Sequence, residues 1–253
     1  MKIYKVLFVA FFIFTSCNNE AKKCGNSSTE LATLIKSHEE RKSFDRNEYP
    51  LGLYTREHYK VEAVYAESKM QYFDCIQMDA LSETEQISAK LLKFVLQDKI
   101  DYYKFERFLN PLLSDSGFHS SLNYQIRPLN NYWEVKEYLK KLNSLPEFVN
   151  QHFVNLREGL EKGVSQPKVI FKGYETTYND HIVDDFNKSP FYKPFLNLPS
   201  SLNQSQKDSV LTAAKTAIEE KVVPEFKKIK TFFETEYLPK TRTTLGVSET
   251  PNG

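Results

Sequence analysis

The chain has five histidines, the side chains best suited to acid–base or metal chemistry, at His38, His58, His119, His152 and His181. A zinc hydrolase needs two imidazoles one helical turn apart and an adjacent carboxylate that acts on the bound water, as in the pattern His-Glu-x-x-His. No two of these histidines lie within five residues of each other, and no second imidazole follows His38-Glu39 at that spacing. The sequence therefore predicts no metal ligands and no bound cofactor in this chain.

Other catalytic patterns are missing as well. The sequence has no Gly-x-Ser-x-Gly elbow for a serine nucleophile and no glycine-rich loop for a phosphate, and it contains only eight glycines. The acidic pairs Asp184-Asp185 and Glu219-Glu220 are typical of solvated helix faces. A lone histidine such as His152 is typical of a hydrogen-bonded core or surface residue. We therefore expect no catalytic residue, and no self-sufficient active site, in this chain.

The elements that must position these residues are predicted to be helices. After the first thirty residues the apolar side chains recur at helical spacing, and no run alternates as a strand would. Ser82-Glu83-Thr84-Glu85 has the spacing of a capping box, which starts a helix. Asn110-Pro111 is expected to end this helix. Its apolar stripe consists of Ile87, Leu91 and Val95.

Two further helices are predicted to form a tight hairpin in the middle of the chain. The first is expected from Trp133 to Leu142, and a second capping box at Ser144-Leu145-Pro146-Glu147 starts the next one. Gly163 is expected to end this second helix in the left-handed conformation. The side chains expected to face inward are Phe148, His152 (or Phe153), Leu156 and Leu160.

The carboxyl-terminal part is predicted to contain a segment from Pro167 to about Phe186 and a long helix from Asn203 to Leu238. Pro224 lies inside the long helix, where its missing N–H removes one helical hydrogen bond, so the helix should kink there. The predicted fold is all-α, an irregular multi-helix bundle with a long kinked C-terminal helix and one long polar loop.

The long polar loop extends from Ser114 to Asn131. It is rich in the turn formers Asp, Ser, Gly, Asn and Pro, and it contains His119. Its apolar residues are Phe118, Leu122, Tyr124 and Ile126. A loop of this length in a compact domain is usually functional or packed against a neighbour.

The amino-terminal residues predict where the protein is located. Lys2 and Lys5 precede the apolar run Val6–Phe14, as in a secretory signal peptide, and the run is too short to span a bilayer. Phe14-Thr15-Ser16-Cys17 resembles the bacterial lipobox, in which the cysteine becomes the lipidated first residue, although phenylalanine stands where leucine is usual. The alternative is an ordinary signal peptide followed by an unmodified cysteine.

We therefore expect a signal peptide at residues 1–16, a lipidated tether at 17–30 and a helical domain at 31–253. Acyl chains on Cys17 would hold the protein on the lipid bilayer. Asn18 stands where an aspartate would favour retention in the inner membrane of some bacteria. The predicted location is thus the cell envelope, at the outer membrane.

Charge and cysteine content restrict the partners. The chain has 34 Lys and Arg against 33 Asp and Glu, and loss of residues 1–16 removes Lys2 and Lys5, which leaves 32 against 33. A nearly neutral protein has no broad basic surface, so no nucleic-acid partner is expected. With Cys17 assigned to lipid, Cys24 and Cys75 remain. A disulfide framework is therefore not expected to hold the fold together.

Several segments resemble the bacterial family called domain of unknown function 885. The pattern Arg-Glu-Gly-x-x-x-Gly-x-x-x-Pro, from Arg157 to Pro167, is the most specific of them. The resemblance covers the chain from about Leu51 to Gly253. The segments that carry it are 117–121, 132–142, 145–146, 155–169, 237–239, 245–246 and 251–253.

This resemblance implies a largely helical, secreted or lipid-anchored protein that is similar to zinc metallopeptidases. The zinc motif of the family, His-Glu-x-x-Pro-Gly-His, belongs to a second half, so zinc is expected only together with that half. Family members continue beyond the position of Pro251-Asn252-Gly253, and the sequence is therefore expected to be a truncated form.

The resemblance also assigns a role to the polar loop. Gly117-Phe118-His119 would lie toward a groove shared with the zinc half, and His119 would contact the substrate by hydrogen-bonding a carbonyl or carboxylate. The alternative is that the apolar residues of the loop hold it against the helices while His119 is solvated.

Three functional hypotheses follow. The first is the amino-terminal half of a zinc-peptidase-like lipoprotein, which forms one wall of a peptide-substrate groove and is inactive alone. The second is a non-catalytic envelope lipoprotein that binds peptide or another envelope component. The third is a remnant without a stable role.

Overall fold

The computed structural model describes residues 25–251, and its regular structure is helical, which confirms the predicted all-α class. Pro167 and Arg242 form one isolated bridge, and no strand occurs within residues 25–251. The α-helices are α1 Ser27–Glu39, α2 Arg56–Met70, α3 Glu83–Lys104, α4 Tyr132–Asn143, α5 Leu145–Glu161, α6 Thr176–Asn179, α7 Gln204–Ala217 and α8 Val223–Thr231.

Shorter helical turns connect these elements. Two are π-helical, η8 Ile218–Val222 and η9 Phe232–Tyr237. The 3₁₀ turns are η1 Gln71–Cys75, η2 Met78–Ala80, η3 Arg107–Leu109, η4 Ser120–Gln125, η5 Lys168–Phe171, η6 Phe186–Lys188, η7 Pro190–Asn197, η10 Leu238–Lys240 and η11 Val247–Glu249. Among the described helices, none has the length and apolar character needed to cross a membrane.

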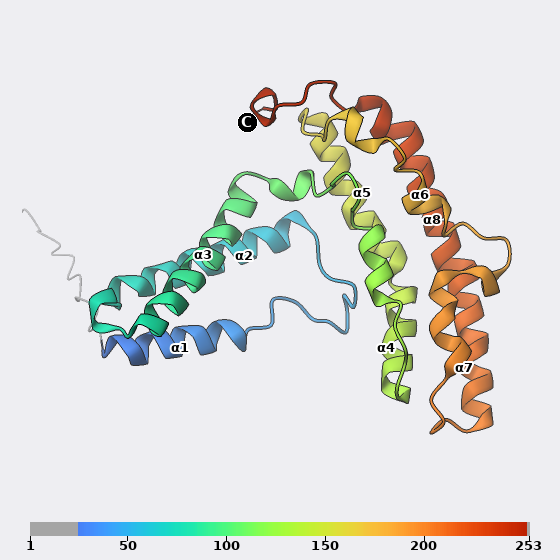
Figure 1. Ribbon diagram of the computed structural model, residues 1–253, viewed down its shortest axis with the longest axis horizontal. Helices are drawn as coiled ribbons and strands as arrows, with labels where there is room; N and C mark the ends of the chain where they lie inside the picture. The colour runs from blue at the N-terminus through green and yellow to red at the C-terminus, as the bar shows by residue number, and fades with distance from the viewer. Residues whose placement is uncertain (1–24, 252–253) are drawn as a thin grey trace, which may run out of the picture.

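The helices form two lobes, each with its own hydrophobic core (Figure 1). In the first lobe α3 packs against both α1 and α2. In the second lobe the hairpin of α4 and α5 packs against α7, η8 and α8. The first core is small and contains Leu31, Leu34, Ala66, Ile76, Leu81, Ala89, Leu92 and Leu96.

The first lobe begins earlier than the sequence predicts. α1 starts at Ser27, so residues 27–30 of the predicted tether are helical. Asn26 caps the helix, and the hydroxyl of Ser27 accepts a hydrogen bond from the backbone N–H of Gln77 at 3.0 Å. Cys75 is buried and forms a disulfide, so one disulfide does contribute to this lobe. The other cysteines of the chain are Cys17 and Cys24, which lie outside the described residues.

α3 starts at the predicted capping box. The Ser82 hydroxyl accepts from the Glu85 N–H at 3.4 Å, and the Glu85 carboxylate accepts from the Ser82 N–H at 2.8 Å. The helix ends before Asn110-Pro111, because Glu106 adopts a left-handed φ of 49°. The face that α3 buries consists of Ala89, Leu92 and Leu96.

The hairpin of α4 and α5 is confirmed. The predicted capping box at Ser144 does not form, since the Ser144 hydroxyl donates to the carbonyl of Lys141 at 2.9 Å. Pro146 lies in the first turn of α5, where its missing N–H costs little. Gly163 follows the helix with φ +72°, as predicted. Phe148, His152, Phe153 and Leu156 are buried.

The predicted long C-terminal helix is present as a continuous run of α7, η8, α8 and η9. η8 ends two residues before Pro224, and such a π-helical turn accommodates the lost hydrogen bond inside a helix. The segment predicted from Pro167 to Phe186 does not form one helix. It contains η5 and the four residues of α6, separated by turns.

Candidate functional site

The predicted polar loop is a compact segment that is packed against the second lobe. Its residues 120–125 form η4, and Phe118, Leu122 and Leu129 are buried in the large core. Tyr124 is 87% exposed, so it does not hold the segment against the helices.

His119 lies in the interior of this segment. Its side chain is 0% exposed, and its Nε2 atom lies 2.8 Å from the hydroxyl oxygen of Thr177. The ring of Tyr174 contacts it edge-on. Burial, and secondarily the charge of His181, lower the pKa of His119 to about 3. The alternative of a solvated His119 is therefore wrong, while its expected contact with a substrate at a groove shared with a second half stays a prediction.

A pocket of about 630 Å³ lies where this segment meets α5. We call it the His152 pocket, after its most buried polar residue. Residues of the polar segment form most of its wall, and α5, Pro111 and the chain before α2 supply the rest. It is lined by Tyr54, Pro111, Asp115, Ser116, Gly117, Phe118, Ser120, Ser121, Asn123, Tyr124, Phe148 and His152.

His152 occupies the aromatic side of this pocket. Its ring stacks on Phe118 at 4.6 Å between centroids and lies 4.4 Å from the ring of Tyr54. Both ring nitrogens are buried without a hydrogen-bond partner among residues 25–251. Burial, and secondarily the charge of His119, lower the pKa of His152 to about 3. His152 is therefore a neutral imidazole with one donor and one acceptor to satisfy.

Most of the remaining lining is polar. It consists of hydroxyl, amide and carboxylate groups on a tight turn, which is stabilised where the Ser120 hydroxyl accepts from the Gly117 N–H at 2.8 Å. Asp115 is the only charged residue in the lining. A lining that combines aromatic rings with polar groups suits a ligand with both apolar groups and neutral hydrogen-bonding groups.

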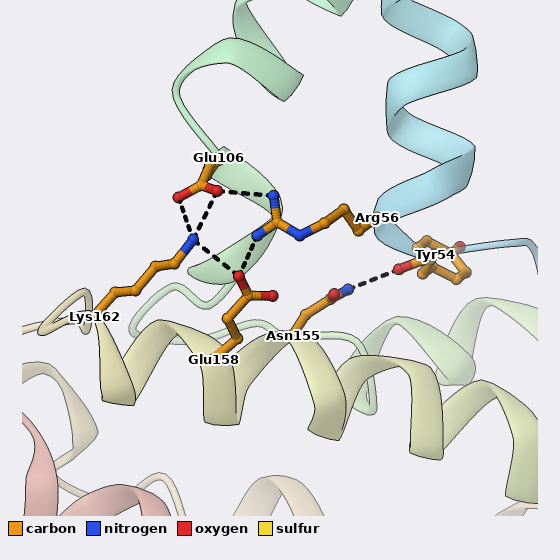
Figure 2. A network of polar contacts seen from close by, with 6 residues as sticks. All are labelled: Tyr54, Arg56, Glu106, Asn155, Glu158 and Lys162. Atoms are coloured by element: carbon orange, nitrogen blue, oxygen red, sulfur yellow. Dashed lines mark hydrogen bonds and ion pairs between the residues drawn. The ribbon is translucent and has the colours of Figure 1, made fainter.

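Two polar residues of α5 position Tyr54 at the pocket. The Tyr54 N–H donates to Gln151 at 2.6 Å, and the Tyr54 carbonyl accepts from Asn155 at 2.7 Å. Figure 2 shows the contact between Asn155 and Tyr54, together with the ionic network beside it. Gln151 and Asn155 are both buried, so these two hydrogen bonds are shielded from water.

The ionic network joins the two lobes. Arg56, at the start of α2, bonds Glu106 at 2.8 Å and also bonds Glu158 of α5 (Figure 2). Lys162 bonds the same two carboxylates at 2.8 and 2.9 Å. The Lys162 hydrogen bond is the main cause of the lowered pKa of Glu106. Burial opposes ionisation of Glu158, but Lys162 and Arg56 outweigh it and lower its pKa.

Each residue of the motif Arg157-Glu158-Gly159 makes or permits a packing contact within the fold. Arg157 forms a bidentate pair with Glu236 at 2.7 and 2.9 Å. Glu158 belongs to the network between the lobes. At Gly159 a Cβ atom would lie 2.5 Å from the carbonyl oxygen of Leu109, so only glycine lets η3 approach α5 this closely.

The buried histidines do not fit a metal. The ring of Phe118 lies beside both His119 and His152, at 5.1 and 4.6 Å between centroids. Within residues 25–251, no group of three His, Cys, Asp or Glu residues is arranged to hold a metal ion. The donors described here therefore do not form the zinc site that the family resemblance implies for a complete protein.

Two other pockets occur in the described part of the chain. One of about 400 Å³ has both cations and carboxylates in its lining, which includes Arg46, Arg127, Trp133, Glu134, Glu137 and Lys141. Burial, and then the charge of Arg127, lower the pKa of Lys141. The other, of about 1250 Å³, lies between the end of α3, the end of α5 and the C-terminal residues. Neither contains an unpartnered buried polar side chain.

Sequence reasoning found part of the pocket. It predicted His152 as inward-facing, which is confirmed, but treated it as an ordinary core or surface histidine. The signal it missed is the polar character of Gln151 and Asn155, which flank His152 on a helix face that is otherwise apolar. Nothing local marks Tyr54, because its role depends on contacts with residues about 100 positions away.

Comparisons with known proteins give a family and a similar fold. A family model described as "Bacterial protein of unknown function (DUF885)" matches residues 44–253, which include the whole His152 pocket. A comparison with curated proteins gave no match. The fold is similar to that of a crystal structure described as the "putative lipoprotein from Colwellia psychrerythraea", with 13% identity and a TM-score of 0.59. The similarity covers 90% of this chain and 42% of that one, so the chain spans less than half of this relative.

Proposed function

The chain belongs to the DUF885 family of bacterial proteins of unknown function, and from this premise we propose that it is the ligand-binding, non-catalytic part of a bacterial envelope lipoprotein. Its ligand is a peptide, and the binding site is the His152 pocket. The observation that carries the proposal is the combination of aromatic rings, neutral polar groups and an unpartnered neutral imidazole in the lining of one pocket.

The chemistry of a peptide matches this lining. Apolar side chains of a peptide would pack on Tyr54, Phe118 and Phe148, while its backbone amides would meet the hydroxyl and amide groups of the rim. A backbone amide offers the donor and the acceptor that the two buried nitrogens of His152 lack, and reaching them requires the aromatic rings that cover them to move. The lining contains one carboxylate and no basic residue, so a nucleic acid does not fit.

The proposed location is the cell envelope, with the lipid on Cys17 and the outer membrane as the membrane concerned. The signal peptide and Cys17 lie outside the described residues, and the lipobox resemblance supports them. The disulfide of Cys75 also supports export, because disulfides persist in oxidising compartments and are rare in the cytosol. The description of the Colwellia relative as a lipoprotein agrees with this location.

In this proposal catalysis belongs to a further part of a longer protein, and the chain is inactive alone. The family resemblance assigns zinc to that part, and the described residues contain no fitting donor set. The length of the relative, of which this chain covers 42%, leaves room for such a part.

Binding of fluorescein-labelled random octapeptides to the purified protein, followed by fluorescence anisotropy, tests the proposal. We expect saturable binding that Asn123→Trp, which places an indole on the pocket rim, weakens at least tenfold. The control Thr212→Trp adds the same side chain to an exposed position of α7 and should leave binding unchanged. Absence of saturable binding, or equal loss in both variants at unchanged melting temperature, would contradict peptide binding in this pocket.

A further inference from the structure

α3 presents an apolar face to solvent. Ile87, Leu91, Phe94 and Val95 are 54%, 61%, 71% and 41% exposed. Their spacing of four, three and one residues places them on one side of the helix, opposite the face that α3 buries in the first core. The helical spacing of apolar residues in the sequence identifies this stripe. Such spacing does not show whether the stripe is buried in the protein interior.

A contiguous apolar face of this kind is unusual on the solvent-exposed surface of a protein. Single exposed apolar residues are normal, whereas a contiguous group marks a surface that contacts a protein or a membrane. Two lysines of the same helical segment, Lys90 and Lys93, are exposed. The group ends at Asp98, which pairs with Arg107 at 2.6 Å. The apolar face therefore extends from Ile87 to Val95 and does not reach the last turns of α3.

The chain enters the first lobe beside this face. Ser82 and, secondarily, Ser28 of the first turn of α1 lower the pKa of Glu85, in the first turn of α3, and the two helices pack against each other. Figure 1 shows the starts of α1 and α3 at the same end of the lobe. Cys17 precedes Asn26, the cap of α1, by nine residues. An extended chain of that length spans at most about 30 Å.

The disulfide shortens this distance. If Cys17 carries lipid, Cys24 is the remaining partner for Cys75, whose η1 turn belongs to the first lobe. Cys24 follows Cys17 by seven positions in the sequence. The anchor is then confined to roughly 25 Å from the lobe, so it cannot hold the protein far from the membrane.

We infer that the face of α3 formed by Ile87, Leu91, Phe94 and Val95 lies against the lipid bilayer that holds the Cys17 anchor. This inference rests on the lipidation in the proposed function, and its ligand is a lipid surface. Apolar residues of an interfacial helix enter the boundary between headgroups and acyl chains, while lysines extend toward the headgroups. Several acyl chains already suffice for stable anchoring, so the face orients the protein on the membrane.

Tryptophan quenching in the full-length lipidated protein tests this contact. The chain has a single tryptophan, so Trp133→Phe gives a background in which Phe94→Trp is the only indole. The protein is reconstituted into vesicles of phosphatidylethanolamine and phosphatidylglycerol that carry brominated acyl chains. We expect at least twofold quenching, against little for the control Val154→Trp, which replaces a residue of α5 that is 54% exposed.

The outcomes separate the two proposals. Protein that floats with the vesicles and shows no more quenching at position 94 than at position 154 would overturn the contact of α3 while leaving the anchor intact. An indole at 94 that is shielded yet unquenched by bromine would also overturn it, since another protein surface would then cover the face. The Cys17→Ala variant, which cannot carry the lipid, is expected not to float with the vesicles. If the original protein also fails to float, both the anchor and this inference would be overturned.

Discussion

His119 and His152 are two imidazoles that share one aromatic core yet differ in their hydrogen bonding. His119 has one partner, Thr177 at its Nε2 atom, and its Nδ1 atom has none, whereas neither nitrogen of His152 has a partner among the described residues. An unpaired buried polar group costs about 1–3 kcal/mol. A side chain that carries such a cost beside a pocket is a good candidate to hydrogen-bond a ligand, which is why His152, and not His119, defines the proposed site.

The two histidines also predict how stability depends on pH. Their pKa of about 3 in the folded protein lies below the value of 6.5 expected after unfolding. Between these values the unfolded chain binds more protons, so the free energy of unfolding should fall as the pH falls below about 6.5. The slope approaches ~1.4 kcal/mol per pH unit for each histidine.

Urea unfolding at pH 7.5, 6.5 and 5.5 measures this slope, in a range above the ordinary pKa of carboxylates. The double variant His119→Gln/His152→Gln should flatten it. His38→Gln replaces an imidazole that is only partly buried, and should change the slope less. Equal stability of the original protein at all three pH values would contradict the prediction.

α5 is the element on which both the pocket and the lobe junction depend. One side contributes His152 and the residues that hold Tyr54, and its last turns contribute Glu158 and Gly159. The motif that carries the family resemblance therefore specifies how η3 and α2 pack on α5. It acts on the pocket only through this packing.

Gly159→Ala tests that packing. Alanine favours a helix by up to ~1 kcal/mol relative to glycine. Here, however, the new Cβ atom would lie 2.5 Å from the backbone carbonyl of Leu109, which cannot rotate away as a flexible side chain could. We expect a net loss of about 1–3 kcal/mol in the free energy of unfolding.

Chemical denaturation measures this loss. Val154→Ala, at an exposed position of the same helix, is the matched control and should change stability by less than about 0.5 kcal/mol. A Gly159→Ala protein as stable as the original would show that η3 can move away without cost.

At the scale of the whole molecule, two lobes with separate cores meet at the network of Arg56, Glu106, Glu158 and Lys162. The second lobe carries the proposed peptide site, and the first carries the disulfide and the apolar face of α3. Membrane contact and ligand binding are thus assigned to different lobes.

The three cysteines predict the covalent state of the mature protein. We expect lipid on Cys17 and a disulfide between Cys24 and Cys75, because Cys75 is disulfide-bonded and one partner must remain once Cys17 is modified. Intact mass spectrometry should show the added acyl mass and a gain of about two hydrogens on reduction. Peptide mapping that finds Cys75 as a free thiol, or bonded to Cys17, would contradict this assignment.

Features that depend on nearby residues could be derived from the amino-acid sequence. The capping box at Ser82, the hairpin of α4 and α5, the left-handed Gly163 and the helical run through Pro224 each depend on residues within a turn or two, and all are present. The predicted capping box at Ser144 does not form, because the Ser144 hydroxyl donates its hydrogen bond to the carbonyl of Lys141 in the last turn of α4.

Features that depend on distant contacts appear only in the tertiary structure. Whether His119 is solvated, whether the stripe of Ile87, Leu91 and Val95 faces the interior, and where Tyr54 lies are all decided by elements far apart in the chain. A helical period shows that a face is apolar, but burial depends on which other helices cover it, and many long-range arrangements satisfy the same local pattern. For this reason the helices could be derived locally, while the pocket and the exposed face of α3 emerged only from how those helices pack.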